Sequence, residues 1–173
     1  MVGMIVTVRG GDWVLDKTVK FVYAGWLLIA ELDGDNELLR SYTWGRDLSG
    51  GLDAAGGVGG LMAVKDHVAD QTFWPVYDDK GNVMALVDAD DENHPVVASI
   101  EYGPYGELTA VDGLPGSGID RSNVADVCPF LFSTKYLDAE LAPSGGLYYY
   151  GCRYYEPTAG KWLNRDPLAE EAG

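Results

Sequence analysis

Basic residues are scarce in this sequence: 12 lysines and arginines stand against 27 aspartates and glutamates, which gives a net charge of −15. A phosphate backbone is bound through a basic surface that displaces its counterions, so we expect no nucleic-acid partner. Docking on an anionic membrane is disfavoured for the same reason. The charge indicates a soluble surface that repels other copies of the chain.

Cysteine and histidine are nearly absent too. Cys128 and Cys152 match no CxxC or metal-ligand spacing, and we favour two unrelated buried thiols over a disulfide between them. His67 and His94 have no nucleophile or metal-ligand set around them in the sequence, and we interpret both as ordinary loop or strand residues. The acidic run 88–92 lacks the ligand pattern of a calcium loop. We therefore expect neither a metal nor a cofactor.

No long hydrophobic run opens the sequence. The first residues, MVGMIV, are not a basic segment followed by a long apolar core, so they predict neither a signal peptide nor a membrane span. Export would then require a larger chain or a dedicated secretion machine.

Glycine and tyrosine, in contrast, are abundant, with 23 and 11 residues in a chain of 173. Both favour strands joined by tight turns over helices, and the length suits one domain with a sizeable core. We therefore predict a single all-β domain over residues 1–173.

Strand-like segments alternate with turn signals almost throughout. Lys17 to Ala30 is apolar with a possible break at Gly25, and three further strands are predicted at Leu38–Trp44, Val83–Val87 and Val96–Tyr102. No long stretch has a helical stripe, and only Asp120–Val127 and the last eight residues have room for one helical turn.

Two glycine-rich segments need separate interpretation. Leu52–Val64, LDAAGGVGGLMAV, lacks the spacing of a phosphate-binding loop and predicts a close approach of two backbones that leads into a strand. Val111–Asn123 is a polar loop rich in glycine, proline and serine, and it is the segment most suited to proteolytic cleavage or to an insertion.

A weak internal repeat is visible. Tyr77 is followed four residues later by Gly81, and Tyr102 is followed four residues later by Gly106. In each unit the tyrosine ends a strand and the glycine turns the chain into the next strand. Such units do not bury an aromatic face alone, so neighbouring units must stack.

Aromatic residues concentrate near the end of the chain, in GGLYYYGCRYYEPTAGKWLNRDP. We predict two strands around a turn at residues 157–160, with Tyr148 and Tyr150 on one face and Tyr149 on the other. Stacking on nucleic acid would require more basic residues between the aromatics, so core packing is favoured. The structural aromatic strip comprises Tyr148, Tyr150, Tyr154 and Trp162.

Several of these segments resemble one family. YDDKGNVMALVDAD and EYGPYGEL resemble tyrosine-aspartate (YD) repeats, and residues 129–167 resemble the Rhs repeat-associated core domain of polymorphic toxins. The resemblance divides the chain into YD-type repeats at 17–111, a polar loop at 112–128 and a core-associated segment at 129–173. It implies a curved strip of successive antiparallel hairpins that coils into a hollow shell around a C-terminal toxin.

The family resemblance also implies an aspartyl-type self-cleavage in the core domain. Arg165 and Asp166 match its first catalytic motif, while the second aspartate motif falls beyond Gly173. Aspartyl hydrolysis requires two carboxylates that share a proton, so this chain carries at most half of a site. The alternative is that an aspartate before proline simply ends a strand. The later carboxylates, Glu170 and Glu171, are too near in sequence to face Asp166 freely.

Three functions follow for testing. The favoured one is a structural shell segment that pairs with other YD-repeat segments, with copies of itself or with a C-terminal toxin polypeptide. The second is an autoprotease completed by another chain. The third is a carbohydrate-binding module, which is disfavoured because the tryptophans are spread over the chain, at Trp13, Trp26, Trp44, Trp74 and Trp162.

The strip also predicts self-association. We expect Lys17–Ala30 to form an exposed edge strand without a preceding turn of sheet, and unpaired backbone groups there would template another copy. The product would be a ring or a filament favoured by salt, and proline at Val22 would abolish it.

Overall fold

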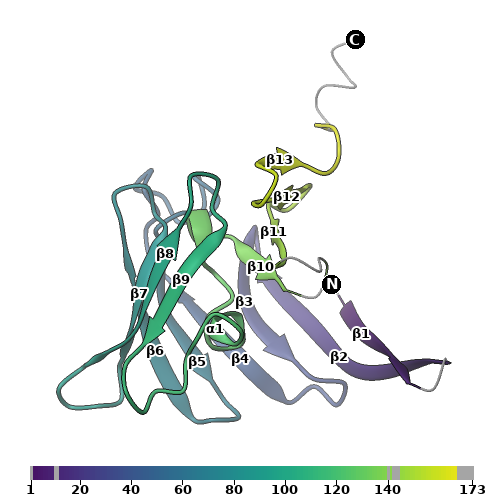
Figure 1. Cartoon of the computed structure of the whole chain (residues 1–173), viewed down its shortest axis with the longest axis horizontal. Coiled ribbons are helices and arrows are strands. Elements are labelled where there is room, and N and C mark those ends of the chain that lie inside the picture. Colours follow the sequence, from purple (N-terminus) through teal and green to yellow (C-terminus); the bar gives the residue numbers. More distant parts are fainter. Residues whose placement is uncertain (1, 10–11, 140, 142–144, 167–173) are drawn as a thin grey trace.

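Strands follow one another almost without interruption in a computed structural model, which describes residues 2–9, 12–139, 141 and 145–166, with side chains from residue 17 onward. They form one 9-stranded sheet and one 4-stranded sheet (Figure 1). The large sheet contains β1 (Val2–Arg9), β2 (Asp12–Ala24), β3 (Leu27–Leu32), β4 (Leu38–Trp44), β5 (Leu61–Asp66), β6 (Gln71–Tyr77), β7 (Val83–Asp88), β8 (Val96–Tyr102) and β9 (Leu108–Gly113).

Each strand of the large sheet pairs antiparallel with its neighbours in sequence, from β1 to β9 without a crossover. Within the described residues the sheet stays an open, curved strip with β1 and β9 at its two edges (Figure 1). The predicted all-β fold of successive antiparallel hairpins is therefore confirmed.

A recurring irregularity accompanies the curvature of the strip. The pairing register shifts directly before Tyr23, Trp44, Tyr77 and Tyr102, and each shift leaves one extra residue in the partner strand, β3, β5, β7 or β9. These aromatics end their strands or lie next to the last residue, and alternate strands of a meander end on the same side. Because a bulge bends and twists its strand, repeated bulges on one side curve the whole strip.

The inner face of the strip forms the core. Leu61, Val64, Phe73, Leu86 and Ile100 are buried there. Leu61 and Val64 are three positions apart, and both face inward because the register shift between β4 and β5 leaves one extra residue, Met62, between them. Outward-facing neighbours such as Met62, Trp74 and Val76 are exposed.

The C-terminal part of the chain lies in the concavity and continues beside it (Figure 1). It contains α1 (Val124–Val127), the 3-10 turn η1 (Phe132–Thr134) and the small sheet of β10 (Tyr136–Asp138), β11 (Leu147–Tyr149), β12 (Tyr154–Glu156) and β13 (Lys161–Trp162). Figure 1 shows α1 within the curve of the large sheet. Phe130 packs edge-on against Tyr42 and Trp44, and Val83 N–H donates to the Leu131 carbonyl at 3.2 Å.

The predicted strands at Leu38–Trp44, Val83–Val87 and Val96–Tyr102 are confirmed as β4, β7 and β8. The break at Gly25 is confirmed as well, since Gly25 has a φ of +61° in the turn between β2 and β3. The predicted helical turn at Asp120–Val127 contains α1, whereas the last eight residues lie outside the described part except for Asp166.

The predicted exposed edge at Lys17–Ala30 is wrong. β1 pairs with β2 from Val2 opposite Lys20 to Arg9 opposite Asp12, so β2 lies inside the sheet. Val22 itself pairs with Ala30 of β3. The strand at this end of the sheet is β1, whose pattern of glycine and short apolar residues was not read as a strand.

The interpretation of the thiols is corrected in part. Cys128 and Cys152 are both free, so no disulfide joins them, but Cys152 is exposed and only Cys128 is buried. Within the described residues, no helix is long and apolar enough to cross a bilayer.

The expected close approach of backbones at Leu52–Val64 is confirmed. A Cβ placed on Gly81 would lie 3.0 Å from the Gly59 nitrogen, and the segment leads into β5. Glycine at both positions lets the two turns touch.

Candidate functional site

The repeat tyrosines lie at strand ends and bind the neighbouring strands. Tyr77 is the last residue of β6, and its hydroxyl donates to the Leu61 carbonyl at 2.6 Å. Tyr102 is the last residue of β8, and its hydroxyl donates to the Val83 carbonyl at 2.7 Å. Each tyrosine hydroxyl thus binds the first residue of the preceding strand. These hydrogen bonds hold together the open ends of the β5–β6 and β7–β8 hairpins.

The repeat glycines occupy the turns that follow these tyrosines. Gly81 has a φ of +79° and Gly106 a φ of +89°, which few other residues adopt without strain. A Cβ on Gly106 would lie 2.5 Å from the ring of Phe132, and the hydroxyl of Tyr148 donates to the Gly106 carbonyl at 3.1 Å. The turns are therefore the surface against which the C-terminal segment packs.

Thr134 joins two of the turns to this segment. Its hydroxyl accepts a hydrogen bond from Gly59 N–H at 2.7 Å and donates one to the Gly81 carbonyl at 2.7 Å. Ser133 N–H donates to the Asn82 side-chain oxygen at 2.8 Å beside it. The sequence analysis did not single out Thr134, although it lies in the block that resembles the core domain.

A buried charged cluster holds α1 against the sheet. The carboxylate of Glu31 on β3 binds the guanidinium of Arg40 on β4 at 2.7 Å and accepts a hydrogen bond from the Tyr42 hydroxyl at 2.5 Å. Arg40 also donates to the carbonyls of Ala125 and Asp126 at 3.2 and 2.8 Å. Arg40 thus supplies hydrogen-bond donors both to the carbonyl groups of α1 and to the buried Glu31 carboxylate. Neither residue was anticipated, because their pairing depends on strand register.

The residues of the aromatic strip divide among three groups of ring contacts. Tyr150 and Trp162 pack together at 4.9 Å between ring centroids, and Tyr155 joins them at 5.3 Å from Trp162. Tyr148 is fully buried and lies beside Phe132. Tyr154 packs instead against Tyr149, at 5.2 Å.

Arg165 and Asp166 follow β13. Arg165 is exposed, whereas the Asp166 carboxylate forms an ion pair of 3.1 Å with Arg153. The Arg153 guanidinium lies 4.2 Å from the centre of the Trp162 ring. Arg153 is thus held between an aromatic face and the aspartate, a role that the sequence analysis missed. Glu170 and Glu171 lie outside the described residues.

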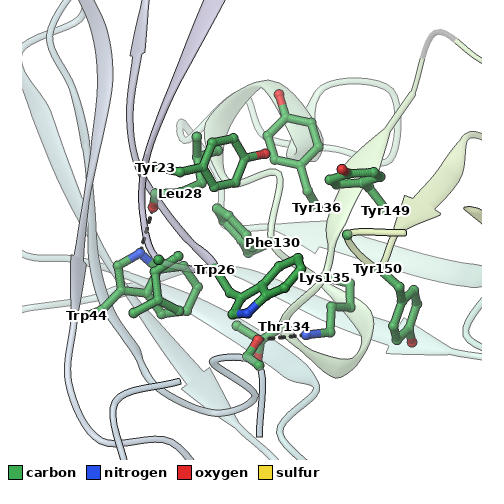
Figure 2. Close-up of a pocket in the computed structure, with 14 residues that line it drawn as sticks. Tyr23, Trp26, Leu28, Trp44, Phe130, Thr134, Lys135, Tyr136, Tyr149 and Tyr150 are labelled. Carbon is green, nitrogen blue, oxygen red and sulfur yellow. Dashed lines mark hydrogen bonds between the residues drawn. The ribbon is translucent and has the colours of Figure 1, made fainter. Parts of the chain in front are cut away.

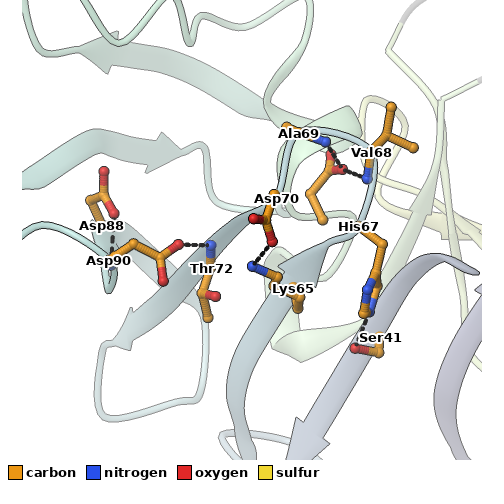
Figure 3. A network of polar contacts seen from close by, with 10 residues as sticks. Ser41, Lys65, His67, Val68, Ala69, Asp70, Thr72, Asp88 and Asp90 are labelled. Carbon is orange, nitrogen blue, oxygen red and sulfur yellow. Dashed lines mark hydrogen bonds and ion pairs between the residues drawn. The ribbon is translucent and has the colours of Figure 1, made fainter.

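A second polar network surrounds the β5–β6 turn (Figure 3). The Nε2 atom of His67 lies 2.9 Å from the Ser41 hydroxyl, and Lys65 forms an ion pair with Asp70 at 2.6 Å. Asp66 accepts hydrogen bonds from two backbone N–H groups of its own turn, at 2.8 Å each. The carboxylates of this network therefore bind lysine and backbone groups, and the arrangement stabilises a turn. Among the described residues no three histidine, cysteine or acidic side chains gather as a metal site.

No protein-family model matches the chain. Toxin subunit YenC2 of Yersinia entomophaga is 42% identical over 79 residues, which cover 45% of this chain and 7% of that protein. Toxin subunit YenC1 of the same organism is 43% identical over 72 residues, which cover 42% of the chain and 6% of that protein. The chain therefore spans less than a tenth of the length of these relatives.

A third relative aligns over more of the chain. The tRNA3(Ser)-specific nuclease WapA of Bacillus spizizenii is 24% identical over 140 residues, which cover 81% of this chain and 5% of that protein. Among solved structures, TcdB2-TccC3-TEV matches 97% of the chain with a TM-score of 0.60 at 18% identity. TcdB2-TccC3 without its hypervariable C-terminal region matches with a TM-score of 0.58. The chain covers 7% of each of these structures, and at this identity the likeness shows the fold.

Proposed function

We propose that this chain, an Rhs-type repeat segment by its sequence and its fold, forms one arc of a β-strand wall that surrounds a polypeptide cargo. In the proposal, β1 to β9 are the wall and residues 129–166 cap one side of it. Neighbouring wall segments continue the sheet at its edges.

One observation carries this proposal. Nine strands follow in sequence order, and the turns on one side of the strip hold the C-terminal segment through Thr134, Phe132 and Tyr148. A segment that lies in the concavity on that side is suited to close a hollow wall. Its relatives include toxin subunits, so we infer that the complete protein is exported and that its cargo is toxic.

Protease protection tests the enclosure. The product of the natural reading frame is digested with trypsin. Gly106→Phe is the variant expected to open the wall, and Gly116→Phe is the matched control. Gly106 faces Phe132, whereas a side chain at Gly116 meets nothing within 4 Å. Any polypeptide inside the wall is expected to resist digestion until position 106 is changed. Equal digestion of all three proteins would refute enclosure.

A second proposal concerns self-cleavage. Asp166 would supply one carboxylate, with Arg153 as the group that positions it through the 3.1 Å ion pair. The test mixes the chain with a polypeptide that carries the downstream aspartate motif. A specific cut is expected, abolished by Asp166→Asn and kept by Asp79→Asn, an exposed control in the turn after Tyr77. No cut at any mixing ratio contradicts this proposal.

Self-association by strand addition remains a proposal, but the edge strand that would carry it is β1 and not residues 17–30. β1 is one of the two edge strands of the sheet, and we place the strand addition there. Adjacent residues of a strand direct their N–H groups to opposite sides, so one of Met4→Pro and Ile5→Pro should block addition and leave the pairing with β2 intact. Light scattering at high salt is expected to show assembly that one of these variants removes. A monodisperse wild-type monomer under the same conditions refutes it.

A further inference from the structure

A partly enclosed pocket of about 240 Å³ lies between the two sheets. The β2–β3 turn, the loop between β4 and β5, the segment around η1 and the end of β11 all contribute to it (Figure 2). The tryptophans that seem scattered in the sequence partly converge here, because Trp26 and Trp44 both line the pocket.

Aromatic rings form most of the walls. Trp44 packs edge-on against Phe130 at 5.1 Å between ring centroids, which makes a rigid inner wall. Trp26 is 68% exposed, and a Cβ on Gly151 would lie 3.4 Å from its ring. Tyr149 and Tyr150 line the side formed by the small sheet (Figure 2). A flat ring that entered the pocket would meet several faces and edges of other rings, the arrangement that aromatic pairs prefer.

Lys135 is the cation of the pocket. Its ammonium donates to the Gly56 carbonyl at 2.7 Å and lies 5.5 Å from the centre of the Tyr150 ring. No carboxylate of the described residues forms an ion pair with it. Burial lowers the pKa of Lys135, against the opposing attraction of Asp47. An ammonium in this position gains from an anion that replaces its lost hydration.

Two other polar groups of the lining are already engaged within the protein. Trp44 Nε1–H donates to the Leu28 carbonyl at 2.7 Å, and the Thr134 hydroxyl bridges Gly59 and Gly81. A sugar would bring several hydroxyls against walls that are mostly aromatic, and each hydroxyl left without a partner would cost binding free energy. The lining therefore favours a flat apolar body with a single charged group.

We propose that this pocket binds a planar aromatic anion, with the ring among Trp26, Trp44 and Tyr150 and the carboxylate or sulfonate on the ammonium of Lys135. The local charge of Lys135 supports this choice, and it acts against the repulsion that the net charge of −15 exerts on any anion. The proposal is independent of whether the wall encloses a cargo.

Isothermal titration calorimetry on the chain tests it with three probes: indole-3-acetate, its neutral analogue indole-3-acetamide, and glucuronate as a sugar acid. The acetate is expected to bind roughly tenfold more tightly than the amide, the size of a charge-assisted hydrogen bond. Lys135→Met should remove that preference. Lys17→Met is the matched control, since it removes an exposed lysine six residues from Tyr23 along β2, roughly 20 Å away.

Equal affinity for acetate and amide, or a preference that survives Lys135→Met, would overturn the proposal. So would glucuronate binding as tightly as the indole acid. If Lys135→Met loses its β circular dichroism spectrum, Trp26→Leu supplies a second test, because Trp26 is mostly exposed. This change should weaken both indole probes several-fold, and unchanged binding would contradict the proposed position of the ring.

Discussion

The carboxylate of Glu31 and the guanidinium of Arg40 meet at 2.7 Å inside the protein, where the Glu31 side chain has no exposed area. The pair lies on adjacent strands, opposite each other in the β3–β4 register. Through the Arg40 contacts with residues 125 and 126, it also fixes α1 in the concavity. This ion pair therefore joins the large sheet to the helix in its concavity.

Removing one partner should be costly. Arg40→Met leaves the Glu31 carboxylate buried without a cation, with only the Tyr42 hydrogen bond, and should lower the free energy of unfolding by about 3–5 kcal/mol. Urea denaturation followed by circular dichroism measures the change. Asp70→Asn is the control, because the Asp70 side chain in its ion pair with Lys65 is 90% exposed and should contribute nothing measurable. Similar stability of the two variants would contradict the role given to the buried pair.

The second prediction concerns the repeat turns. It separates the steric crowding of a new side chain at Gly106 from the backbone strain of a positive φ. Gly106 and Gly116 have similar φ values, +89° and +94°, but only Gly106 faces a ring at 2.5 Å. Gly106→Ala should therefore lose about 1–3 kcal/mol more than Gly116→Ala, the range for overpacking. The same urea titration measures this. Equal losses would mean that Phe132 does not pack on the turn.

The thiols should differ sharply in reactivity. Burial raises the pKa of the Cys128 thiol to about 12, and Cys152 is exposed. Because the thiolate is the reactive form, a disulfide reagent near pH 8 should modify Cys152 alone in the folded chain and both thiols in urea. A Cys152→Ser variant should show no fast reaction. Rapid reaction of that variant would contradict the burial of Cys128.

Stability should fall in alkali. Burial, with smaller effects of Tyr149, Tyr154 and Glu31, raises the pKa of Tyr23 to about 12 from an ordinary value of 10.0. The folded state favours the neutral phenol, so this contribution is complete below about pH 10 and is lost as the pH rises towards 12. Urea midpoints measured across this window should fall, and less steeply in Tyr23→Phe. A flat profile, or the same slope in both proteins, would contradict the assignment.

Local patterns were sufficient to predict the arrangement in successive hairpins and the strands β4, β7 and β8. Turn residues such as Gly81 and Gly106, each four positions after a tyrosine, mark hairpins whose partners are neighbours in sequence, and such pairings need no long-range information. The glycine-rich segment at 52–64 was interpretable on similar grounds, because glycine without a phosphate-loop spacing indicates close backbones. The edge strand was placed at residues 17–30 because residues 2–9, although rich in β-branched residues, were not considered as a preceding strand.

The contacts across the concavity were beyond the sequence. The Thr134 bridge to Gly59 and Gly81, the ion pair of Arg153 with Asp166, and the burial of Lys135 among aromatics all join segments far apart in the chain. Each depends on how the C-terminal segment returns to the turns. Hydrophobic periodicity identifies single strands, but it does not predict where the C-terminal segment packs on the turns.

The central claim is that the chain is one arc of a wall whose sheet continues beyond its own strands. An electron cryo-microscopy structure of the natural reading-frame product tests it most directly. The account predicts that β1 pairs with a strand outside residues 1–173 and that residues 129–166 lie against the turns after Tyr77 and Tyr102, on the inner side of a hollow wall. A β1 edge open to solvent, with the concave face of the strip turned outward and no enclosed space, would contradict it.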